Sequence, residues 1–147
     1  MVILGIDPGL LATGYGVIED NASTLSLVAA GEICPPKTAP LGERLGVIHH
    51  TLTALIQRYH PQHLVLEQLF THHAHVMTAV LMGHARGVVC LAAQEHGVPL
   101  AEYLPTQVKK SLTGSGHASK AQVASMVGDW LNQRVLTLSV DATDALG

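Results

Sequence analysis

The most informative residue for chemistry in this sequence is Asp7, a carboxylate that stands between an apolar run and a turn. Residues 2–6 are almost all apolar and rich in β-formers, which is typical of a strand covered on both faces. Pro8 and Gly9 follow at once and predict a turn. An unpaired buried charge costs on the order of several kcal/mol, so a carboxylate at such a strand end usually meets a metal ion, another cation or backbone N–H groups. Asp7 is therefore the first candidate site residue.

Three further carboxylates could join Asp7. Glu67 ends the short apolar stretch 63–67, and Asp141 and Asp144 stand three residues apart, on one face if residues 140–146 are helical. Clustered carboxylates repel one another and need a cation to hold them together. Hard oxygen ligands favour Mg²⁺ or Mn²⁺ over zinc, and two such ions about 3.5–4 Å apart suit in-line hydrolysis of a phosphodiester. The four acids thus predict a site with two metal ions.

A plainer interpretation exists for two of these acids. Asp141 would serve as a helix N-cap or first-turn residue, where the helix dipole stabilises a negative charge, and Asp144 would be an ordinary surface residue. Taken alone, this pair is a weak signal. Asp7 and Glu67 both end predicted strands and are harder to explain as structural residues, so the four together favour the metal site.

The pattern of apolar residues predicts the elements that bring these side chains together. Three strands joined by short turns form an antiparallel meander. Helices and strands then alternate, which implies an α/β fold with a five-stranded mixed sheet and helices on both faces. Sites in such sheets form at the carboxyl ends of the strands. We expect a single domain over 1–147, with strands at 2–6, 14–19, 24–33, 63–67 and 98–103 and helices at 41–59, 74–96, 105–112, 117–132 and from 140 onward.

Composition sets outer bounds on the function. Hydrophobic residues make up 48% of the 147 residues and charged residues 13%, which indicates a folded chain. The net charge of -3 argues mildly against a nucleic-acid partner. A local basic patch can still bind nucleic acid on a chain whose net charge is negative. Cys34 and Cys90 have no metal-binding spacing and are expected to be reduced thiols. No signal peptide or membrane span is expected, so the predicted location is the cytoplasm.

A series of motifs, in order along nearly the whole chain, resembles the RuvC family of bacterial Holliday-junction resolvases. Several of these motifs are specific. The resemblance implies a ribonuclease H-like fold and a homodimeric, divalent-metal endonuclease that nicks two strands of like polarity symmetrically at a four-way DNA junction, in recombination and repair. The motifs are the stretches 5–9, 13–16 (Thr-Gly-Tyr-Gly), 67–70 (Glu-Gln-Leu-Phe), 83–87 (Gly-His-Ala-Arg-Gly), 107–110 (Gln-Val-Lys-Lys), 114–123 and 141–146.

The same resemblance implies roles for basic and aromatic residues. Lys109 and Lys120 fall at positions that contact DNA, and Lys120 also at one that assists catalysis, because an ammonium beside the scissile phosphate neutralises charge that grows in the transition state. Lys110 and Arg86 are assigned to DNA contact too, with bracing of the helix as the alternative for Arg86. Phe70 falls at a position that stacks on an unpaired base. The plain alternatives are solvated surface lysines and a phenylalanine in the core.

The resemblance also implies partners: four-way junction DNA, a second copy of the chain, and a branch-migration helicase complex. Two metal ions, Mg²⁺ or Mn²⁺, are expected at each active site. The family's helix after the last motif normally continues, so we expect a truncated C-terminal helix here. The roles of His72, His73 and His75 stay open, as do the cleavage consensus and the metal used in the cell.

Two functions of other classes remain open at this point. An actin-like or sugar-kinase-like nucleotide binder also begins with an Asp-x-Gly turn, at Asp7 and Gly9, but needs a second phosphate loop and more chain than this one has. The other is a catalytically silent relative, a junction-binding or RNA-processing module, and the presence of all four acids argues against it. Incubation with a junction, with and without Mg²⁺, and separately with ATP discriminates among the three.

Overall fold

The computed structural model describes residues 1–68 and 76–131, and every predicted element inside these ranges is present. The helix predicted from 140 onward lies outside them. The bounds differ from the predicted ones by a few residues only. The elements are β1 (Val2–Asp7), β2 (Thr13–Asp20), β3 (Leu25–Ile33), α1 (Leu41–Tyr59), β4 (His63–Glu67), α2 (Val76–Glu95), β5 (Leu100–Tyr103), α3 (Pro105–Thr113) and α4 (Lys120–Trp130).

The described strands form one five-stranded mixed sheet in the order β3-β2-β1-β4-β5. β1 pairs with β2, and β2 with β3, in antiparallel fashion, which is the predicted meander. β4 and β5 join on the other side of β1 as parallel strands. A parallel neighbour needs a crossover connection, and α1 supplies one between β3 and β4 while α2 lies between β4 and β5. The predicted mixed sheet is thus confirmed.

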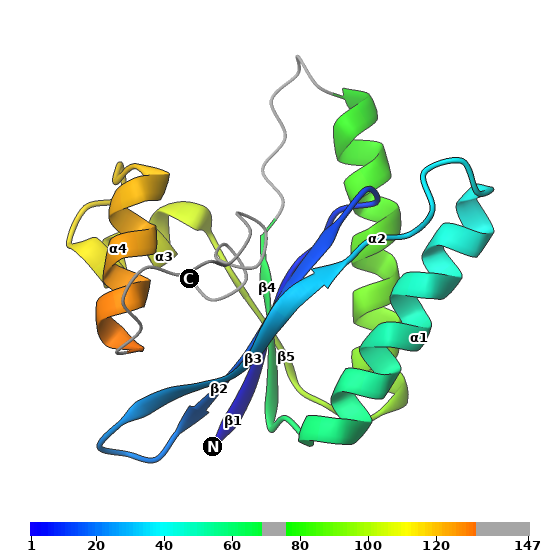
Figure 1. Cartoon of the computed structure of the whole chain (residues 1–147). Coiled ribbons are helices and arrows are strands. Elements are labelled where there is room, and N and C mark those ends of the chain that lie inside the picture. Colours follow the sequence, from blue (N-terminus) through cyan, green and yellow to red (C-terminus); the bar gives the residue numbers. More distant parts are fainter. Residues whose placement is uncertain (69–75, 132–147) are drawn as a thin grey trace.

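Helices cover both faces of this sheet, as predicted (Figure 1). Helices α1 and α2 pack on one face, where buried residues of β1, β2 and β4 meet them. The strands contribute Leu4, Ile6, Val17, Leu64 and Leu66 to this core, and the helices contribute Ile48, Leu52, Leu55, Ile56, Ala85, Val89, Ala92 and Ala93. Helix α4 packs on the opposite face through Val123 and Val127, against Ile18, Leu25 and Leu27 of the meander.

Helix α2 is unusually apolar on its exposed side. Among the described residues it is the one helix long and apolar enough to cross a membrane, a test that the core helix of a soluble protein also passes. One side of it is a core face, because Ala85, Val89, Ala92 and Ala93 are buried against α1 and the sheet. The helix also leaves large apolar side chains exposed outside this core: Val76, Met77, Val80, Leu81 and Leu91. We call this set the α2 apolar face.

Candidate active site

Asp7 and Glu67 end two neighbouring parallel strands. Ile6 pairs with Leu66 in the register of β1 and β4, so the next residue on each strand is one of the two acids. Adjacent strands lie about 4.8 Å apart, which places the two acidic residues side by side. Side chains alternate between the faces of a strand. Because Ile6 and Leu66 are buried on the α1–α2 face, both carboxylates lie on the face that carries α3 and α4.

The turn after Asp7 is fixed by a tight set of contacts. The Thr13 hydroxyl, fully buried at the start of β2, donates to the Gly9 carbonyl at 2.7 Å and accepts from the Gly9 N–H at 3.3 Å. The Arg44 side chain of α1 donates to the Leu10 carbonyl at 2.7 Å. A Cβ on Gly9 would lie 2.2 Å from the Ala12 carbonyl oxygen. The turn therefore needs glycine, and it anchors the strand end that carries Asp7.

We expect Gly9→Ala to lower the free energy of unfolding by roughly 1–3 kcal/mol, since the added methyl group overlaps a backbone atom that cannot rotate away. Gly46→Ala in α1 is the matched control, because a Cβ there meets nothing within 4 Å. That change should stabilise the helix by about 0.5–1 kcal/mol. Urea denaturation of both variants measures the two effects. Equal stability of the Gly9 variant and the wild type would show that the turn tolerates a side chain.

A cavity of about 550 Å³ opens beside the strand ends. Glu67 lines it from β4, Lys109 from α3 and Lys120 from the first residue of α4. The structure thus brings together one predicted carboxylate and two predicted basic residues that are far apart in the sequence. A carboxylate beside two ammonium groups is suited to a phosphate ester, because the cations attract the anion and the carboxylate can hold a metal ion or polarise water.

The connection between α3 and α4 explains why these lysines reach the cavity. Gly114 ends α3 in the left-handed conformation, with φ of 78°, and its N–H donates to the Lys110 carbonyl. Ser119 caps α4, and its hydroxyl accepts from the Gln122 N–H. The predicted helix at 117–132 therefore begins three residues later than expected, at Lys120. The glycine-rich loop turns the chain so that both helices face the strand ends.

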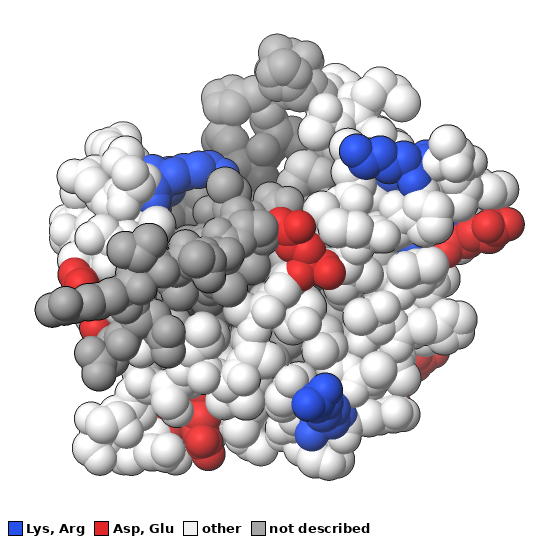
Figure 2. Space-filling model, viewed as in Figure 1, with Lys and Arg blue, Asp and Glu red and all other residues white. Residues whose placement is uncertain are grey.

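Basic side chains gather where α3 and α4 lie. Figure 2 shows basic side chains, drawn in blue, at the upper left over these two helices. The described lysines of the two helices are Lys109, Lys110 and Lys120. Lys110 is exposed and does not line the cavity that the other two share. The structure therefore contains a local basic patch in a chain whose average charge is negative.

Arg86 lies in α2, on the other side of the same strand end. One guanidinium nitrogen donates to the main-chain carbonyl of Glu67, and the other forms an ion pair with the Glu102 carboxylate of β5. The side chain is only 14% exposed. These contacts agree with the alternative prediction, that Arg86 braces its helix. Arg86 does not line the cavity.

Two residues of this region do not stand out in the sequence. Glu102 is the acidic partner of Arg86, and its only sequence signal is its place on the last predicted strand. Tyr103 lines the cavity beside Glu67, is 48% exposed, and follows Glu102 at the end of β5. An exposed aromatic residue at the same edge as two acids is a usable signal, since strand ends at that edge form sites.

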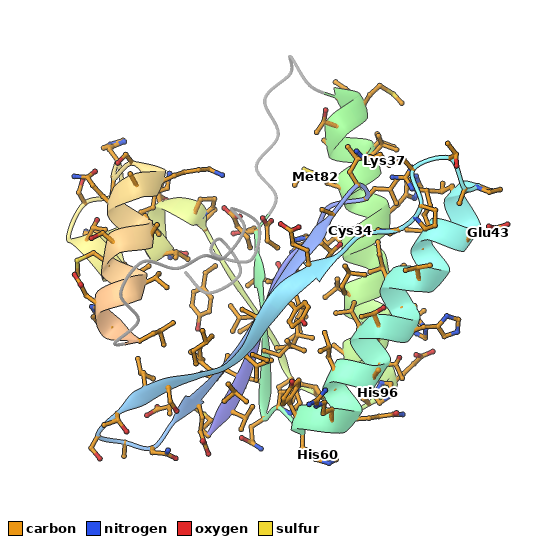
Figure 3. All side chains as sticks on the ribbon, in the orientation of Figure 1. Cys34, Lys37, Glu43, His60, Met82 and His96 are labelled. Carbon is orange, nitrogen blue, oxygen red and sulfur yellow. The ribbon has the colours of Figure 1, made fainter. Side chains whose placement is uncertain are left out.

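Several predicted site residues lie outside the described ranges: Phe70, Asp141 and Asp144, together with His72, His73 and His75. Their assignments stay predictions. Within residues 1–68 and 76–131, no three His, Cys, Asp or Glu side chains lie close enough together to hold a metal ion. The predicted ligand set therefore depends on Asp141 and Asp144 joining the two strand-end acids. His60 and His96 lie in the lower part of Figure 3, where α1 and α2 end, and neither lines the cavity.

Comparison with known proteins decides the family. The family model described as crossover junction endodeoxyribonuclease RuvC matches residues 3–147. The chain belongs to the RuvC family. Curated RuvC proteins from Xanthobacter autotrophicus and Rhodopirellula baltica are each 46% identical over 144 residues, which is 98% of this chain and 84% and 81% of theirs.

Solved structures agree with this membership. A Thermus thermophilus RuvC in complex with a Holliday junction substrate is 35% identical and superposes with a TM-score of 0.93, over 99% of this RuvC-family chain and 88% of the Thermus chain. The yeast mitochondrial Holliday junction resolvase Ydc2 is 13% identical with a TM-score of 0.67, over 97% of this chain and 73% of its own, a likeness of fold alone. The ribonuclease H-like fold predicted from the sequence is therefore confirmed.

Proposed function

We propose that this RuvC-family chain is a crossover junction endodeoxyribonuclease that resolves four-way DNA junctions in recombination and repair. The observation that carries the proposal is the pairing of Asp7 and Glu67 at adjacent strand ends, on the face where Lys109 and Lys120 line the neighbouring cavity. Family membership supplies the substrate class, because the matched relatives are named for the crossover junction. The close structural match to a RuvC in complex with a Holliday junction substrate supports the same assignment.

The donor set at the strand ends fits hard divalent cations. Asp7 and Glu67 offer carboxylate oxygens on one face, and Asp141 and Asp144 are proposed to complete the set. Oxygen ligands of this kind hold Mg²⁺ or Mn²⁺. Two such ions, when bound, lower the pKa of an attacking water and stabilise the leaving 3′ oxygen. The protein's own contribution is to hold the acids together and to place Lys120 where it offsets negative charge on the scissile phosphate.

Phosphate contact is proposed for the patch formed by Lys109, Lys110 and Lys120. Lys120→Ala should reduce the slope of log affinity against log salt by about one unit, because one fewer counterion is released on binding. Lys37→Ala is the matched control, since Lys37 is exposed on the loop before α1, away from α3 and α4 (Figure 3). Junction affinity measured by fluorescence anisotropy over a salt series tests this. A slope equal to that of the wild type would remove Lys120 from the phosphate contacts.

Base stacking is proposed for Phe70, which comes three residues after the end of β4 in the sequence. Phe70→Ala should leave the salt slope unchanged, because no charge is lost, yet weaken junction binding by roughly 1–3 kcal/mol. Leu69→Ala is the neighbouring control for loss of apolar volume. Affinities of both variants for the same junction, measured at one salt concentration, give the comparison. An unchanged affinity for the Phe70 variant would assign the ring to the core instead.

A homodimer is proposed, assembled through the α2 apolar face. Isologous pairing is the commonest form of assembly, and a patch of exposed large apolar side chains marks an interaction site. Two copies related by a two-fold axis would present two active sites, as symmetric nicking of two strands requires.

A branch-migration helicase complex and a cytoplasmic location are proposed on the family resemblance.

A single set of incubations tests the proposed function. The protein is mixed with a labelled four-way junction or with linear duplex of the same sequence, each with and without Mg²⁺, and separately with ATP. We expect nicking of the junction that depends on the metal, little nicking of the duplex, and no hydrolysis of ATP. ATP turnover would indicate a nucleotide-binding enzyme, and junction binding without nicking would indicate a silent relative.

A further inference from the structure

We propose that Arg86 is a positioning residue that holds the end of β4 so that the Glu67 carboxylate faces the cavity. This role rests on the proposed function, since it assumes that Glu67 takes part in catalysis. The reasoning starts from the two faces of the sheet. Glu67 presents its side chain to the α3–α4 face, while Arg86 reaches the main-chain carbonyl of the same residue from α2 on the other face. The arginine thus acts on the strand and not on the carboxylate.

Arg86 binds β4 at the point where the regular pairing of this strand ends. The regular pairing of β4 with β5 finishes at Glu67 and Tyr103, with one further bond from the Gln68 N–H to the Tyr103 carbonyl at 2.8 Å. A slip of this strand end by one residue would turn the Glu67 side chain to the other face, because successive residues face opposite sides of a strand. A charged donor binds a carbonyl more strongly than a neutral one does, so the bond from Arg86 holds the strand end in the register that points Glu67 at the cavity.

Glu102 fixes Arg86 in turn. It stands opposite Leu66 in the register, on the face that α2 covers, and its carboxylate accepts from the second guanidinium nitrogen. The two acceptors therefore lie on adjacent strands, β4 and β5, and one planar group bridges them. Arginine suits this arrangement because its donors form a fixed fork. A lysine carries a single point of charge and would serve one acceptor well, but not both.

The same contacts argue against a phosphate role for Arg86. Its side chain is 14% exposed, whereas that of Glu102 is 39% exposed, so the guanidinium is the more enclosed of the pair. A phosphate would have to displace the Glu102 carboxylate to reach it. Arg86→Gln should therefore leave the salt slope of junction binding unchanged, in contrast to Lys120→Ala.

The activity test compares four variants by single-turnover nicking and junction affinity. Arg86→Gln and Glu102→Gln should each lower the nicking rate, by about 10- to 100-fold for the arginine change, which is typical of losing a group that orients a ligand, while junction affinity stays close to that of the wild type. Arg86→Lys should recover only part of the rate. Arg58→Gln is the matched control, since Arg58 is exposed at the far end of α1, where it lies over the Tyr59 ring.

A second measurement does not depend on activity. Amide hydrogen exchange in Arg86→Gln should be faster at Gln68, at the loosened strand end, and unchanged at Leu64, whose N–H donates to the Pro99 carbonyl at the start of the strand. Equal acceleration at both amides would mean general destabilisation and would overturn the positioning role, as would unchanged exchange at both. If Arg86→Gln does not fold, Glu102→Gln carries the same comparison.

Two further outcomes have distinct meanings. A salt slope reduced by about one unit in Arg86→Gln, with full affinity in Arg86→Lys, would identify a phosphate contact and overturn the proposal. A wild-type protein that does not nick junctions would contradict the proposed function, and the exchange comparison at Gln68 and Leu64 would still decide whether Arg86 fixes the strand end.

Discussion

Asp7→Asn is expected to abolish strand nicking and to leave junction binding largely intact. Asp7 is the last residue of β1, the central strand, and stands beside Glu67 on the next strand. The amide keeps the shape of the side chain but removes the negative charge that a hard cation requires. Losing one group that stabilises transition-state charge costs about 10²–10³-fold in rate, and loss of a shared metal ligand should cost at least as much.

Asp129→Asn is the matched control for this change. Asp129 is exposed near the end of α4 and is absent from the lining of the cavity, so its amide variant should nick at the wild-type rate. Single-turnover nicking with saturating protein and Mg²⁺ separates the chemical step from binding, which anisotropy measures in parallel. A near wild-type rate for Asp7→Asn would show that the four-acid site is wrong.

Val80→Glu is expected to convert the protein to a monomer and to remove paired nicking. Val80 is 47% exposed on the α2 apolar face, so the glutamate is solvated in the monomer and folding is preserved. In the proposed dimer the same carboxylate would be buried without a partner. Burial of an uncompensated charge costs about 3–5 kcal/mol, which weakens the dimer at least about 100-fold at about 1.4 kcal/mol per tenfold.

Val47→Glu on α1 is the matched control, since Val47 is 37% exposed on a helix outside the proposed interface. Sedimentation velocity at micromolar protein should give a dimer for the wild type and for this control, and a monomer for Val80→Glu. A wild-type protein that sediments only as a monomer would exclude the proposed interface, and a dimeric Val80→Glu would place the interface elsewhere.

Much of the fold is predictable because its elements depend on local patterns. The spacing of apolar residues predicts the helix at Leu41–Tyr59 at its observed bounds, and a short apolar run predicts the strand His63–Glu67. The sequence alone also pairs Asp7 with Glu67, since parallel strands bring their carboxyl ends to one edge. The predicted start of α4 is wrong by three residues because Ser119, and not a residue before His117, supplies the cap.

The part of the site that depends on contacts across the sheet could not be predicted. The motif assigns Arg86 to DNA contact or to bracing of its helix. Its contacts with Glu67 and Glu102 join α2 to two strands, and no local sequence pattern indicates them. The shared cavity of Lys109 and Lys120 arises from the angle between α3 and α4, which the Gly114 conformation sets. The assignment of Phe70 depends on the family motif alone, whereas those of Asp141 and Asp144 depend on the family motif and on their spacing.

The most direct test of the central claim is to map the nicks on a four-way junction with each of its strands labelled in turn. The account predicts metal-dependent nicks in two strands of like polarity, at positions related by the two-fold symmetry of the junction, with ends that DNA ligase can rejoin. Nicks in a single strand, nicks in strands of opposite polarity, or equal cleavage of linear duplex would contradict it.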